Sequence, residues 1–374
     1  MVLLIGNYPP DQQQSMDRFA ALLRRGLSAA GIEVELIRPE PFFGNFQLAG
    51  KFIAKWLGYI DKFILFPPQL RKKIAERPAL VHICDHSNAM YAKRAGAVPV
   101  VVTCHDLLAV RGALGEDTDC PASWTGKILQ RWILRSLRRA RTIACVSRAT
   151  CADAERFLGS GGEPKLEVIT LGLNYPYRKL PAPEVIARLK RIRALDSTRP
   201  FVLHVGSNER RKNRDGVLRI FARTKDKWNG QVVFAGDPLP LRIHSLGRKL
   251  GVSSRLVEVV FPESELLETL YNGATALVYP SRSEGFGWPA AEAHACGCPV
   301  ISSDVGPLPE VCGDAALMHP LEDEAAFAAD ILRLTDPAER QLWSDKALRN
   351  ATRFDAGRMI AQYLGIYRAL APQL

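Results

Sequence analysis

Two carboxylates flank a glycine-containing turn in the stretch 277–301, and their spacing suggests a ligand site. Glu284 directly precedes Gly285, Gly287 lies two residues further on, and Glu292 follows in what we expect to be the first turn of a helix. Glycine amides and a helix N-terminus attract anions, whereas carboxylates accept hydrogen bonds from hydroxyl groups. Together these groups suit a ligand with both phosphates and hydroxyls, of which a nucleotide-sugar is an example.

The elements around this turn are predicted to be a strand, a loop, a helix and a second strand. The run 277–279 is short and apolar and ends at Pro280, which is typical of a buried strand. Pro289 fits the first position of a helix, Gly297 ends that helix, and the next strand begins at Pro299. The turn would therefore lie beyond the carboxyl end of a strand, where open α/β sheets bind their ligands.

Basic and imidazole side chains follow two other predicted strands. The strand 201–205 leads through a loop to Arg210-Arg-Lys-Asn213, which precedes a helix. Such residues can hold phosphate oxygens by charge-assisted hydrogen bonds, or can simply form a solvated turn, and both readings stay open. His105 and Asp106 follow the strand 100–104. A lone histidine at a strand end is more often structural, but two polar groups in one crevice make a better candidate.

The first half of the chain reads as a doubly wound sheet. It begins with a strand, a loop, a helix and a strand within 2–37, and the strand 80–83 leads into a loop containing Asp85-His86-Ser87. The strand 142–146 ends at Ser147, which could cap the next helix. No G-x-G-x-x-G follows the first strand, so a nicotinamide or flavin cofactor is not supported.

Length and composition indicate a globular protein of two domains. The chain has 374 residues, 47% of them hydrophobic, and a proline-rich and basic segment places the boundary near 175–185. No apolar run reaches membrane-span length, and Met1–Ile5 is too short for a signal peptide, so we expect a cytoplasmic protein. The eight cysteines read as reduced core residues. We expect no metal site at Cys296 and Cys298 or at Asp117-Thr-Asp119.

The net charge of +11 is concentrated in the first half. Residues 51–148 contain 17 Lys/Arg against 7 Asp/Glu, which suggests an anionic partner for one surface. Nucleic acid, a lipid membrane and phosphate-bearing substrates are the candidates. Nucleic acid is the weaker one, because the sequence has no helix-turn-helix, zinc or aromatic RNA-binding pattern.

Two basic amphipathic segments carry this charge. In 49–66, aromatic and aliphatic residues follow helical spacing, with lysines on the other side and Arg71-Lys-Lys73 shortly after. Such a helix can lie in a membrane interface or can face the core, and both readings stay open. In 127–141, Lys127, Arg131, Arg135 and Arg138 form a basic stripe that we expect opposite Ile128, Trp132, Ile133 and Leu137. We expect that apolar face to be structural and the basic face to be available to anionic lipid.

These motifs together resemble those of the family 4 glycosyltransferases, the group 1 glycosyltransferases with the GT-B fold. The resemblance covers nearly the whole chain and is strongest over 201–318. The matching positions are the E-x7-E motif from Glu284 to Glu292, Gly297-Cys-Pro-Val-Ile301, the acidic turn Gly306–Glu310, the R-K-N of Arg211-Lys212-Asn213, His105-Asp106 and Val146-Ser147.

The resemblance implies an α/β fold of two Rossmann-like, doubly wound domains that face each other across a cleft. Residues 1–175 would form the acceptor-binding, membrane-facing domain, and 176–352 the nucleotide-sugar-binding domain. Residues 353–374 would form a helix that returns to the first domain. The apolar face of that helix is visible in the sequence as Met359, Ile360, Tyr363, Leu364 and Tyr367.

The resemblance also implies residue roles. Catalytic roles would fall to His105, Glu284 and Lys212. The donor would contact Arg211, Lys212, Glu284, Gly285, Phe286, Gly287 and Glu292, with Glu292 on the ribose hydroxyls and Lys212 on the diphosphate. His105, Asp106 and Ser147 would lie on the acceptor side. Two positions depart from the family. Ser207 stands where many members have an arginine, which Arg211 or Arg210 would replace, and Ser15-Met16 stands where many have Gly-Gly.

The expected activity is retaining transfer of a hexose, with mannose from GDP-mannose weakly favoured, to a glycan or polyprenyl-diphosphate-linked acceptor in cell-surface polysaccharide assembly. By the resemblance, the leaving phosphate takes the acceptor proton, and neither a metal nor a cofactor is required. The enzyme would act at the inner face of the cytoplasmic membrane. Its membrane-facing residues would be Lys51, Phe52, Lys55, Trp56, Lys62, Arg71, Lys72 and Lys73. The alternatives are a GT-B sugar-nucleotide epimerase or phosphorylase, and a basic nucleotide-sugar or nucleic-acid binding protein.

Overall fold

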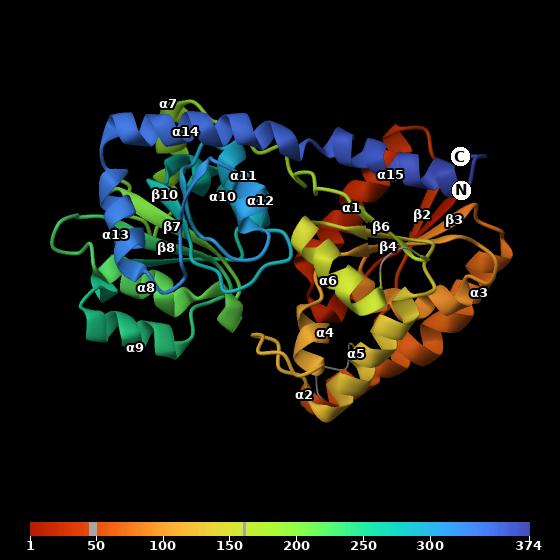
Figure 1. The fold of residues 1–374 in the computed structure, drawn as a ribbon. Coiled ribbons are helices and arrows are strands. Elements are labelled where there is room, and N and C mark those ends of the chain that lie inside the picture. The colour runs from red at the N-terminus through yellow and green to blue at the C-terminus, as the bar shows by residue number, and fades with distance from the viewer. Residues whose placement is uncertain (45–50, 160–161) are drawn as a thin grey trace. The chain divides into compact units, whose positions relative to one another are not determined.

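The computed structural model describes residues 1–44, 51–159 and 162–374, and for 51–55 it describes the backbone alone. The chain forms two compact units. Unit 1 contains Met1–Asn174 together with Ala356–Leu374, and unit 2 contains Tyr175–Asp355. Each unit is built on a six-stranded parallel sheet with helices packed against it (Figure 1). This is the two-domain α/β architecture that the sequence predicts.

The sheet of unit 1 has the strand order β2-β1-β3-β4-β5-β6. The strands are β1 (Val2–Ile5), β2 (Val34–Ile37), β3 (Leu80–Ile83), β4 (Val100–Cys104), β5 (Thr142–Cys145) and β6 (Lys165–Val168). The central strands β1, β3, β4 and β5 are buried along their whole length because a parallel sheet is covered on both faces. Leu4, for example, lies between Leu36 on one side and His82 on the other.

The helices of unit 1 begin with α1 (Gln14–Ala29), whose buried residues include Phe19, Leu22, Leu23 and Leu27. The others are α2 (Lys51–Ile60), α3 (Phe66–Ala75), α4 (Leu108–Ala113), α5 (Trp124–Leu137), α6 (Arg148–Leu158) and α15 (Ala356–Leu370). Short 3-10 helices form at Pro9–Asp11 and His86–Arg94. The second of these corrects the expected loop at 85–87, because the Asp85 carboxylate caps it by accepting from the Ser87 amide.

The sheet of unit 2 has the strand order β12-β11-β10-β7-β8-β9. Its strands are β7 (Phe201–Gly206), β8 (Gln231–Gly236), β9 (Leu256–Val260), β10 (Ala276–Tyr279), β11 (Val300–Ser303) and β12 (Ala316–His319). Its helices are α7 (Ala182–Leu189), α8 (Arg214–Ala222), α9 (Leu241–Leu250), α10 (Ser264–Gly273), α11 (Trp288–Ala295), α12 (Leu308–Cys312), α13 (Glu324–Arg333) and α14 (Pro337–Ala351).

Each sheet has a point at which the direction of strand addition reverses. In unit 2 the first strand, β7, lies between β8 and β10, so later strands are added first on one side and then on the other. In unit 1 the first strand, β1, lies between β2 and β3. Two connections leave such a switch point in opposite directions, which opens a crevice at the carboxyl ends of the two strands. Each unit therefore has one position where its topology favours a ligand.

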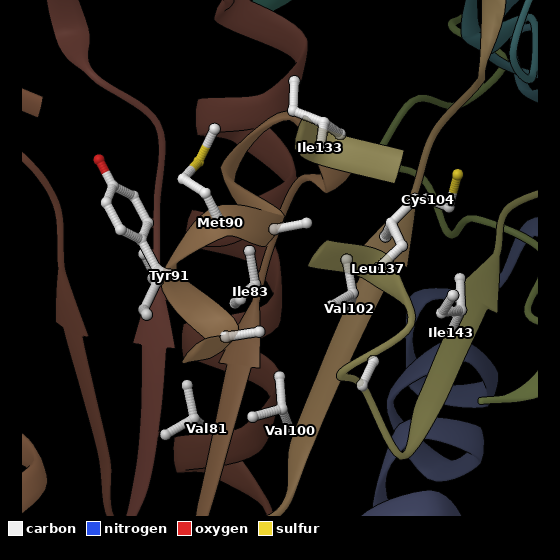
Figure 2. Packing of buried hydrophobic residues seen from close by; sticks show 14 of the residues in the cluster. Val81, Ile83, Met90, Tyr91, Val100, Val102, Cys104, Ile133, Leu137 and Ile143 are labelled. Carbon is white, nitrogen blue, oxygen red and sulfur yellow. The ribbon is translucent and has the colours of Figure 1, made fainter. Parts of the chain in front are cut away.

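Each unit has its own apolar core. Figure 2 shows part of the core of unit 1, in which Val81, Ile83, Val100 and Val102 of the sheet belong to one cluster with Ile133 and Leu137 of α5. In unit 2, Val202, Val232 and Val278 of the sheet pack with α8 and α13. Burial of such side chains contributes roughly 1.5–3 kcal/mol each relative to full exposure, which stabilises the sheets that position the loops.

The last helix, α15, packs within unit 1. All five residues of its predicted apolar face are buried. Two of its tyrosines also make polar contacts with the sheet: the Tyr363 hydroxyl lies 2.8 Å from Thr103 Oγ1, and the Tyr367 hydroxyl lies 2.5 Å from His82 Nδ1. Thr103 and His82 are themselves linked at 2.8 Å. This buried network fixes α15 beneath β3 and β4.

The segment 49–66 is not one regular helix. Residues Asp61–Leu65 form a π-helical turn between α2 and α3. Asp61 is buried at this turn and accepts hydrogen bonds from the Tyr8 hydroxyl and from the amides of Phe43 and Gly44. The π-helical turn is wider than an α-helical one and displaces the Asp61 side chain from the regular helical spacing. In this position the buried carboxylate reaches all three hydrogen-bond donors.

The predicted membrane-facing residues of this region fall into three groups. The side chains of Lys51, Phe52 and Lys55 lie outside the described residues. Trp56, Arg71 and Lys72 are exposed. The remaining two lysines form ion pairs, Lys62 with Asp11 at 2.9 Å and Lys73 with Glu35 at 2.8 Å, so their charges are largely compensated within the protein.

The arrangement predicted for α5 is wrong in one respect. Ile133 and Leu137 are buried, as expected for a structural face. Ile128 and Trp132, however, are about half exposed, at 50% and 45%. They therefore lie beside the basic stripe on the solvent side of the helix and not opposite it. The apolar residues of α5 cover more of its circumference than the core can bury.

Candidate functional site

The switch point of unit 2 brings together three charged side chains that the sequence singled out. Lys212 Nζ lies 2.7 and 2.9 Å from the two carboxylate oxygens of Glu284. Arg211 Nη1 donates to the same carboxylate at 2.8 Å. Lys212 and Glu284 come from the loops that follow β7 and β10, the two strands that flank the switch point. A loop after one strand thus supplies the cations and a loop after its neighbour supplies the anion.

Asn213 explains how the two loops are held together. It has a left-handed backbone conformation, with φ of 52°, between the 3-10 turn Arg210–Lys212 and α8. Asparagine tolerates this conformation better than most residues, and it allows the chain to turn sharply into the helix. Its amide Nδ2 donates to the carbonyl of Pro280 at 3.0 Å, and the amide of Arg282 donates to the carbonyl of Arg211 at 2.7 Å. The R-K-N motif is therefore fixed directly to the loop after β10.

Tyr279 belongs to this cluster, although the sequence analysis did not identify it. Its side chain is fully buried at the end of β10, and its hydroxyl donates to Glu284 Oε1 at 2.6 Å while accepting from Lys212 Nζ at 3.2 Å. Burial raises the pKa of Tyr279 well above its usual range, and the neighbouring Glu284 carboxylate raises it further. The sequence could have identified Tyr279 from its position directly before Pro280, where the strand ends. The last residue of a strand at a switch point lies beside the ligand crevice.

The electrostatics favour an anion near this cluster. Burial by itself would raise the pKa of Glu284, but Lys212 and Arg211 lower it to about 2, so the carboxylate is charged at neutral pH. Burial lowers the pKa of the Lys212 ammonium, and Glu284 opposes that effect. Arg211 Nη2 also pairs with the exposed Glu209 at 2.7 Å, so two cations face two carboxylates, of which only Glu284 is buried. Within the buried part of the cluster the cations outnumber the carboxylate, which suits a phosphate-bearing ligand.

The glycine turn after Glu284 leads into α11. Gly287 has φ of 104°, and a side-chain carbon at this position would come within 2.7 Å of Leu308 Cδ2, so only glycine fits. The Phe286 ring is buried and packs edge-on against Phe354, with ring centroids 5.9 Å apart. Phe286 can therefore contribute its backbone amide to a ligand, as the resemblance implies, but not its side chain.

Helix α11 begins one residue earlier than the sequence predicts. The helix begins at Trp288, so Glu292 is its fifth residue and lies in the second turn. Helix boundaries shift by a residue when a proline is accepted in either of the first two positions. Glu292 is 4% exposed and accepts a hydrogen bond from the Tyr271 hydroxyl of α10 at 2.8 Å. Its carboxylate is thus held in a fixed position beside the start of the helix.

Arg214 is a second residue that sequence reasoning missed. It is 2% exposed, and its guanidinium donates to the carbonyl oxygen of Gly206 after β7, to that of Asp237 after β8 and to Asn208 Oδ1. It therefore fixes the loop that contains Ser207, where an arginine was expected. The Ser207 hydroxyl itself donates to Glu209 at 3.1 Å. Arg211 is the arginine that reaches the cluster, whereas Arg210 is exposed.

The switch point of unit 1 carries a different set of side chains. Asn7 follows β1 and donates through Nδ2 to Asp85 Oδ2 at 2.6 Å, and Asp85 follows β3. Asp85 also accepts from the Ser87 amide and hydroxyl, and His86 Nδ1 lies 3.0 Å from its other oxygen. Burial alone would raise the pKa of Asp85, but His86 holds it well below its usual range. From the sequence, 85–87 was predicted only as a loop, and Asn7 had no assigned role.

His105 lies at the same sheet edge of unit 1, after β4. It is 5% exposed, packs edge-on against Phe19, and donates from Nε2 to the carbonyl of Cys84 at 3.0 Å. Burial lowers the pKa of His105, although Asp85 opposes this shift. The imidazole is therefore neutral at pH 7, and because Nε2 carries the proton, Nδ1 is the hydrogen-bond acceptor.

The other two predicted acceptor-side residues have structural contacts. The Asp106 carboxylate accepts from the Leu108 amide at the start of α4. Ser147 is buried and caps α6 by accepting from the Thr150 amide at 3.1 Å, which confirms the predicted cap. The Thr150 hydroxyl in turn donates to the His105 carbonyl at 3.4 Å. Ser147 therefore helps to position His105, and its contact with an acceptor stays a prediction, as does the cleft between the two domains.

No group of three or more histidine, cysteine or carboxylate side chains suited to a metal ion occurs in residues 1–44, 51–159 and 162–374. Over the same part of the chain, no helix has the combination of length and apolar character needed to cross a bilayer. All eight cysteines are in their free form, and six of them are buried.

Two family models match the chain. Residues 16–175 match the family described as Glycosyltransferase Family 4, and residues 185–349 match Glycosyl transferases group 1. The first match falls within unit 1 and the second within unit 2. Both models are described as glycosyl transferase families.

Curated relatives agree with these matches. A D-inositol 3-phosphate glycosyltransferase from Acidothermus cellulolyticus is 28% identical over 74% of this chain and 63% of its own length. O-antigen chain mannosyltransferase B from Escherichia coli is 33% identical over 46% of each chain. The chain thus spans less than two thirds of the length of these two relatives. A D-inositol 3-phosphate glycosyltransferase from Mycobacterium leprae is matched over 85% of its length, at 28% identity.

Solved structures share the fold over the full length. Sucrose-phosphate synthase from Thermosynechococcus elongatus superimposes with a TM-score of 0.79 at 21% identity, covering 100% of this chain and 99% of that one. WaaG, a glycosyltransferase involved in lipopolysaccharide biosynthesis, gives 0.74 at 16% identity, covering 98% and 99%. At these identities the likeness shows the fold alone, which is GT-B. Two contiguous family matches and this fold lead to one conclusion: the chain belongs to the family 4, or group 1, glycosyl transferases.

Proposed function

We propose that this protein transfers a hexose from a nucleoside-diphosphate sugar to a glycan acceptor with retention of configuration. The observation that carries the proposal is the cluster at the switch point of unit 2. There Lys212 and Arg211 converge on Glu284, next to the Gly285–Gly287 turn and the N-terminus of α11. This combination provides cations and amides for a diphosphate and carboxylates for sugar hydroxyls.

The proposed chemistry breaks the bond between the sugar C1 and the diphosphate oxygen and forms a bond from C1 to an acceptor oxygen. The transition state resembles an oxocarbenium ion, and negative charge grows on the leaving diphosphate. Lys212 and Arg211 stabilise that charge, since they are preorganised and already desolvated. The leaving phosphate oxygen takes the acceptor proton on the same face of the sugar, so the chain supplies no separate base and no metal.

Two carboxylates have different tasks in this proposal. Glu292, held by Tyr271, accepts hydrogen bonds from the ribose hydroxyls. Glu284 accepts hydrogen bonds from the donor sugar while it keeps Lys212 and Arg211 in position. On the acceptor side, neutral His105 accepts a hydrogen bond from a hydroxyl through Nδ1. The donor sugar is a hexose, with mannose from GDP-mannose weakly favoured; the E. coli relative, an O-antigen mannosyltransferase, agrees with that preference.

The central experiment is donor binding by calorimetry with GDP- and UDP-sugars, followed by transfer assays with the donor that binds. Wild-type protein is expected to bind one donor, and Glu292→Ala and Lys212→Ala are expected to lose most of that affinity. Undiminished binding by both variants would refute the site. The anomeric configuration of the product, read by NMR, tests retention, and unchanged transfer in the presence of EDTA tests metal independence.

The alternative activities have distinct outcomes. An epimerase converts the donor without any acceptor, whereas a transferase leaves it intact apart from slow hydrolysis. A phosphorylase requires inorganic phosphate. A binding protein without activity retains donor affinity but gives no product with any acceptor, and nucleic-acid binding appears as a salt-dependent electrophoretic shift.

We also propose that the acceptor is lipid-linked and that the enzyme works at the inner face of the cytoplasmic membrane. Exposed Trp56, Arg71 and Lys72 support contact of the first segment with lipid. The ion pairs of Lys62 and Lys73 reduce the charge that this segment offers. A polyprenyl-diphosphate-linked glycan is the acceptor class to assay first, and transfer to a free oligosaccharide at an equal rate would argue against lipid linkage.

A further inference from the structure

Helix α5 carries two parallel stripes on its solvent side. Trp124, Ile128 and Trp132 recur every four residues and are 76%, 50% and 45% exposed. Lys127, Arg131 and Arg135 recur at the same interval and are exposed too. Residues four apart lie on one face of a helix, so the apolar and basic stripes run side by side along α5.

The apolar stripe continues onto neighbouring helices through a chain of aromatic rings. Trp132 lies 5.4 Å from Phe63, Phe63 lies 5.6 Å from Tyr59, and Tyr59 lies 5.6 Å from Trp56, measured between ring centroids. Trp56 is 50% exposed. In Figure 1, α2, α4 and α5 lie at one end of unit 1, and α4 packs against α5. The stripe is therefore part of a larger aromatic surface, which we call the α5 face.

Exposed large apolar side chains are unevenly distributed in the described part of the chain. In unit 1 they fall between Phe42 and Trp132, and they include three tryptophans. In unit 2 they are scattered over α7, α9, the end of β9 and α14, and none is a tryptophan. Single exposed apolar residues need no explanation, but a contiguous group of large ones indicates an interaction surface.

The charge of the α5 face is of one sign. Helix α5 contains Lys127, Arg131 and Arg135 and no Asp/Glu. Four more Lys/Arg follow before Asp153, and one of them, Arg141, is paired with Glu163. This differs from α3 and the π-helical turn, where Lys73 and Lys62 are paired with carboxylates. The partner of the α5 face must therefore supply negative charge to several cations and, at the same time, bury tryptophan and isoleucine side chains.

We propose that the α5 face docks unit 1 on an anionic lipid surface. Trp124 and Ile128 enter the boundary between headgroups and acyl chains, a position that tryptophan favours because its ring is apolar and its N–H is polar. Lys127, Arg131 and Arg135 lie along the lipid phosphates. This binding does not depend on the proposed transfer reaction; only the idea that it brings the enzyme to a lipid-linked acceptor rests on that function.

A second copy of the chain is a poorer occupant of this face. In a symmetric dimer the same patch meets itself, so the basic stripes of two α5 helices would face each other without intervening carboxylates. Like charges brought together in an interface oppose association. An acidic lipid surface complements both stripes at once.

The test measures binding to vesicles of phosphatidylglycerol mixed with phosphatidylcholine, with vesicles of phosphatidylcholine alone for comparison. The first variant is Trp124→Ser/Ile128→Ser, which leaves Trp132 in place because its ring packs on Phe63. The second is Lys127→Gln/Arg131→Gln. Matched controls in unit 2 are Leu241→Ser, where the side chain is 84% exposed, and Lys190→Gln/Arg193→Gln, which removes two exposed charges. Thermal melting establishes that every variant is folded.

Wild-type protein and both controls are expected to bind the mixed vesicles, less strongly as salt is added. The basic variant is expected to bind about twenty-five-fold more weakly, at about fivefold per cation. The apolar variant is expected to bind the mixed vesicles at least about tenfold more weakly, because it no longer places a tryptophan in the interface. Quenching of tryptophan fluorescence by brominated lipid is expected in wild-type protein and is expected to fall in the apolar variant.

Three results would overturn the proposal. Wild-type protein could fail to bind the mixed vesicles, the apolar variant could bind them as tightly as wild-type protein, or the two unit 2 control variants could lose binding. A dimer that dissociates in the apolar variant, without vesicle binding, would assign the face to a second copy. Donor calorimetry separates this proposal from the proposed function, because the α5 variants are expected to bind donor as wild-type protein does. Failure of donor binding in all proteins would leave the lipid result unaffected.

Discussion

The two switch points of the molecule have the same topology but opposite chemistry. In unit 2 two cations converge on one carboxylate, and a buried tyrosine hydroxyl joins them. In unit 1 one carboxylate is surrounded by an amide, a hydroxyl and an imidazole, with His105 close by in the same sheet edge. The first arrangement suits an anion, and the second suits a ligand with hydroxyl groups. We therefore expect the sheet to determine where a ligand binds and the loop residues to determine which kind.

This contrast makes the donor and acceptor functions separable by mutation. Changes at the unit 2 switch point are expected to reduce donor binding. Changes at the unit 1 switch point are expected to reduce transfer while donor affinity stays as in wild-type protein.

Lys212→Ala is expected to have the largest effect. It removes a preorganised cation from the position where negative charge grows, so turnover is expected to fall about a hundredfold to a thousandfold. Arg211 still neutralises Glu284, and the variant is expected to fold. Steady-state transfer kinetics and donor calorimetry check this, with the exposed Lys190→Ala as control. Normal donor affinity in the Lys212 variant would contradict the proposal that the unit 2 switch point binds the donor.

The pH dependence of stability is expected to differ between wild-type protein and Glu284→Gln. The pKa of Glu284 in the folded state is about 2, below its usual value of 4.5. Its stabilising contribution is therefore present above pH 4.5 and is lost as the pH falls toward 2. The shift corresponds to roughly 3 kcal/mol of unfolding free energy. Urea unfolding between about pH 6 and about pH 3 measures the larger part of this loss, because the remainder falls between pH 3 and pH 2.

The stability gap between those two proteins should narrow as the solution becomes more acidic, since only wild-type protein loses the charged contact. A gap that stays constant with pH would mean that Glu284 is not held as a charged partner of Lys212. Asp117→Asn, at an exposed carboxylate, is the control and is expected to change the pH profile little.

Asp85→Asn tests the unit 1 switch point. The carboxylate accepts from Asn7, from the Ser87 amide and from the Ser87 hydroxyl, and an amide side chain cannot accept all three. Unfolding free energy is expected to fall by about 1–3 kcal/mol. Transfer is expected to slow while donor affinity stays within error of wild type. A parallel loss of donor affinity would contradict the separation of the two sites.

Tyr279→Phe is expected to have the smallest effect. It removes one hydroxyl that bridges Glu284 and Lys212, and leaves their ion pair in place. Stability is expected to fall by about 1 kcal/mol, equivalent to a melting temperature lower by about 2–4 °C. Donor affinity is expected to fall less than in Lys212→Ala. An unchanged melting temperature and affinity would show that the hydroxyl does not hold the cluster.

Much of the architecture was predictable because its signals are local. Apolar runs such as 2–5, 201–205 and 231–236 form buried strands, and the apolar face of α15 follows helical spacing. The proximity of Lys212 to Glu284 was predictable only through the resemblance to a known family. Lys212 and Glu284 are 72 residues apart in the sequence, and secondary-structure propensity carries no information on contacts at that distance.

The sequence-based predictions were wrong where the same residues are compatible with more than one local structure. Helix α11 accepts proline in its first or second position, and its start lies one residue earlier than predicted. The segment 61–65 has helical spacing but forms a π-helical turn around buried Asp61, which binds residues far away in the sequence. Around α5, apolar residues occupy more than one side, and periodicity cannot say which side meets the core.

The sequence alone determined the two α/β units, the order of their elements and the residue types that can bind phosphates and hydroxyls. It did so because strand burial, helix periodicity and turn chemistry depend on neighbours along the chain. Only the tertiary structure decided that Tyr279 and Arg214 support the unit 2 cluster, that Asn7 and Asp85 meet in unit 1, and that Trp124 and Trp132 remain exposed. Those outcomes depend on which side chains distant elements bring into contact and which surface is left uncovered.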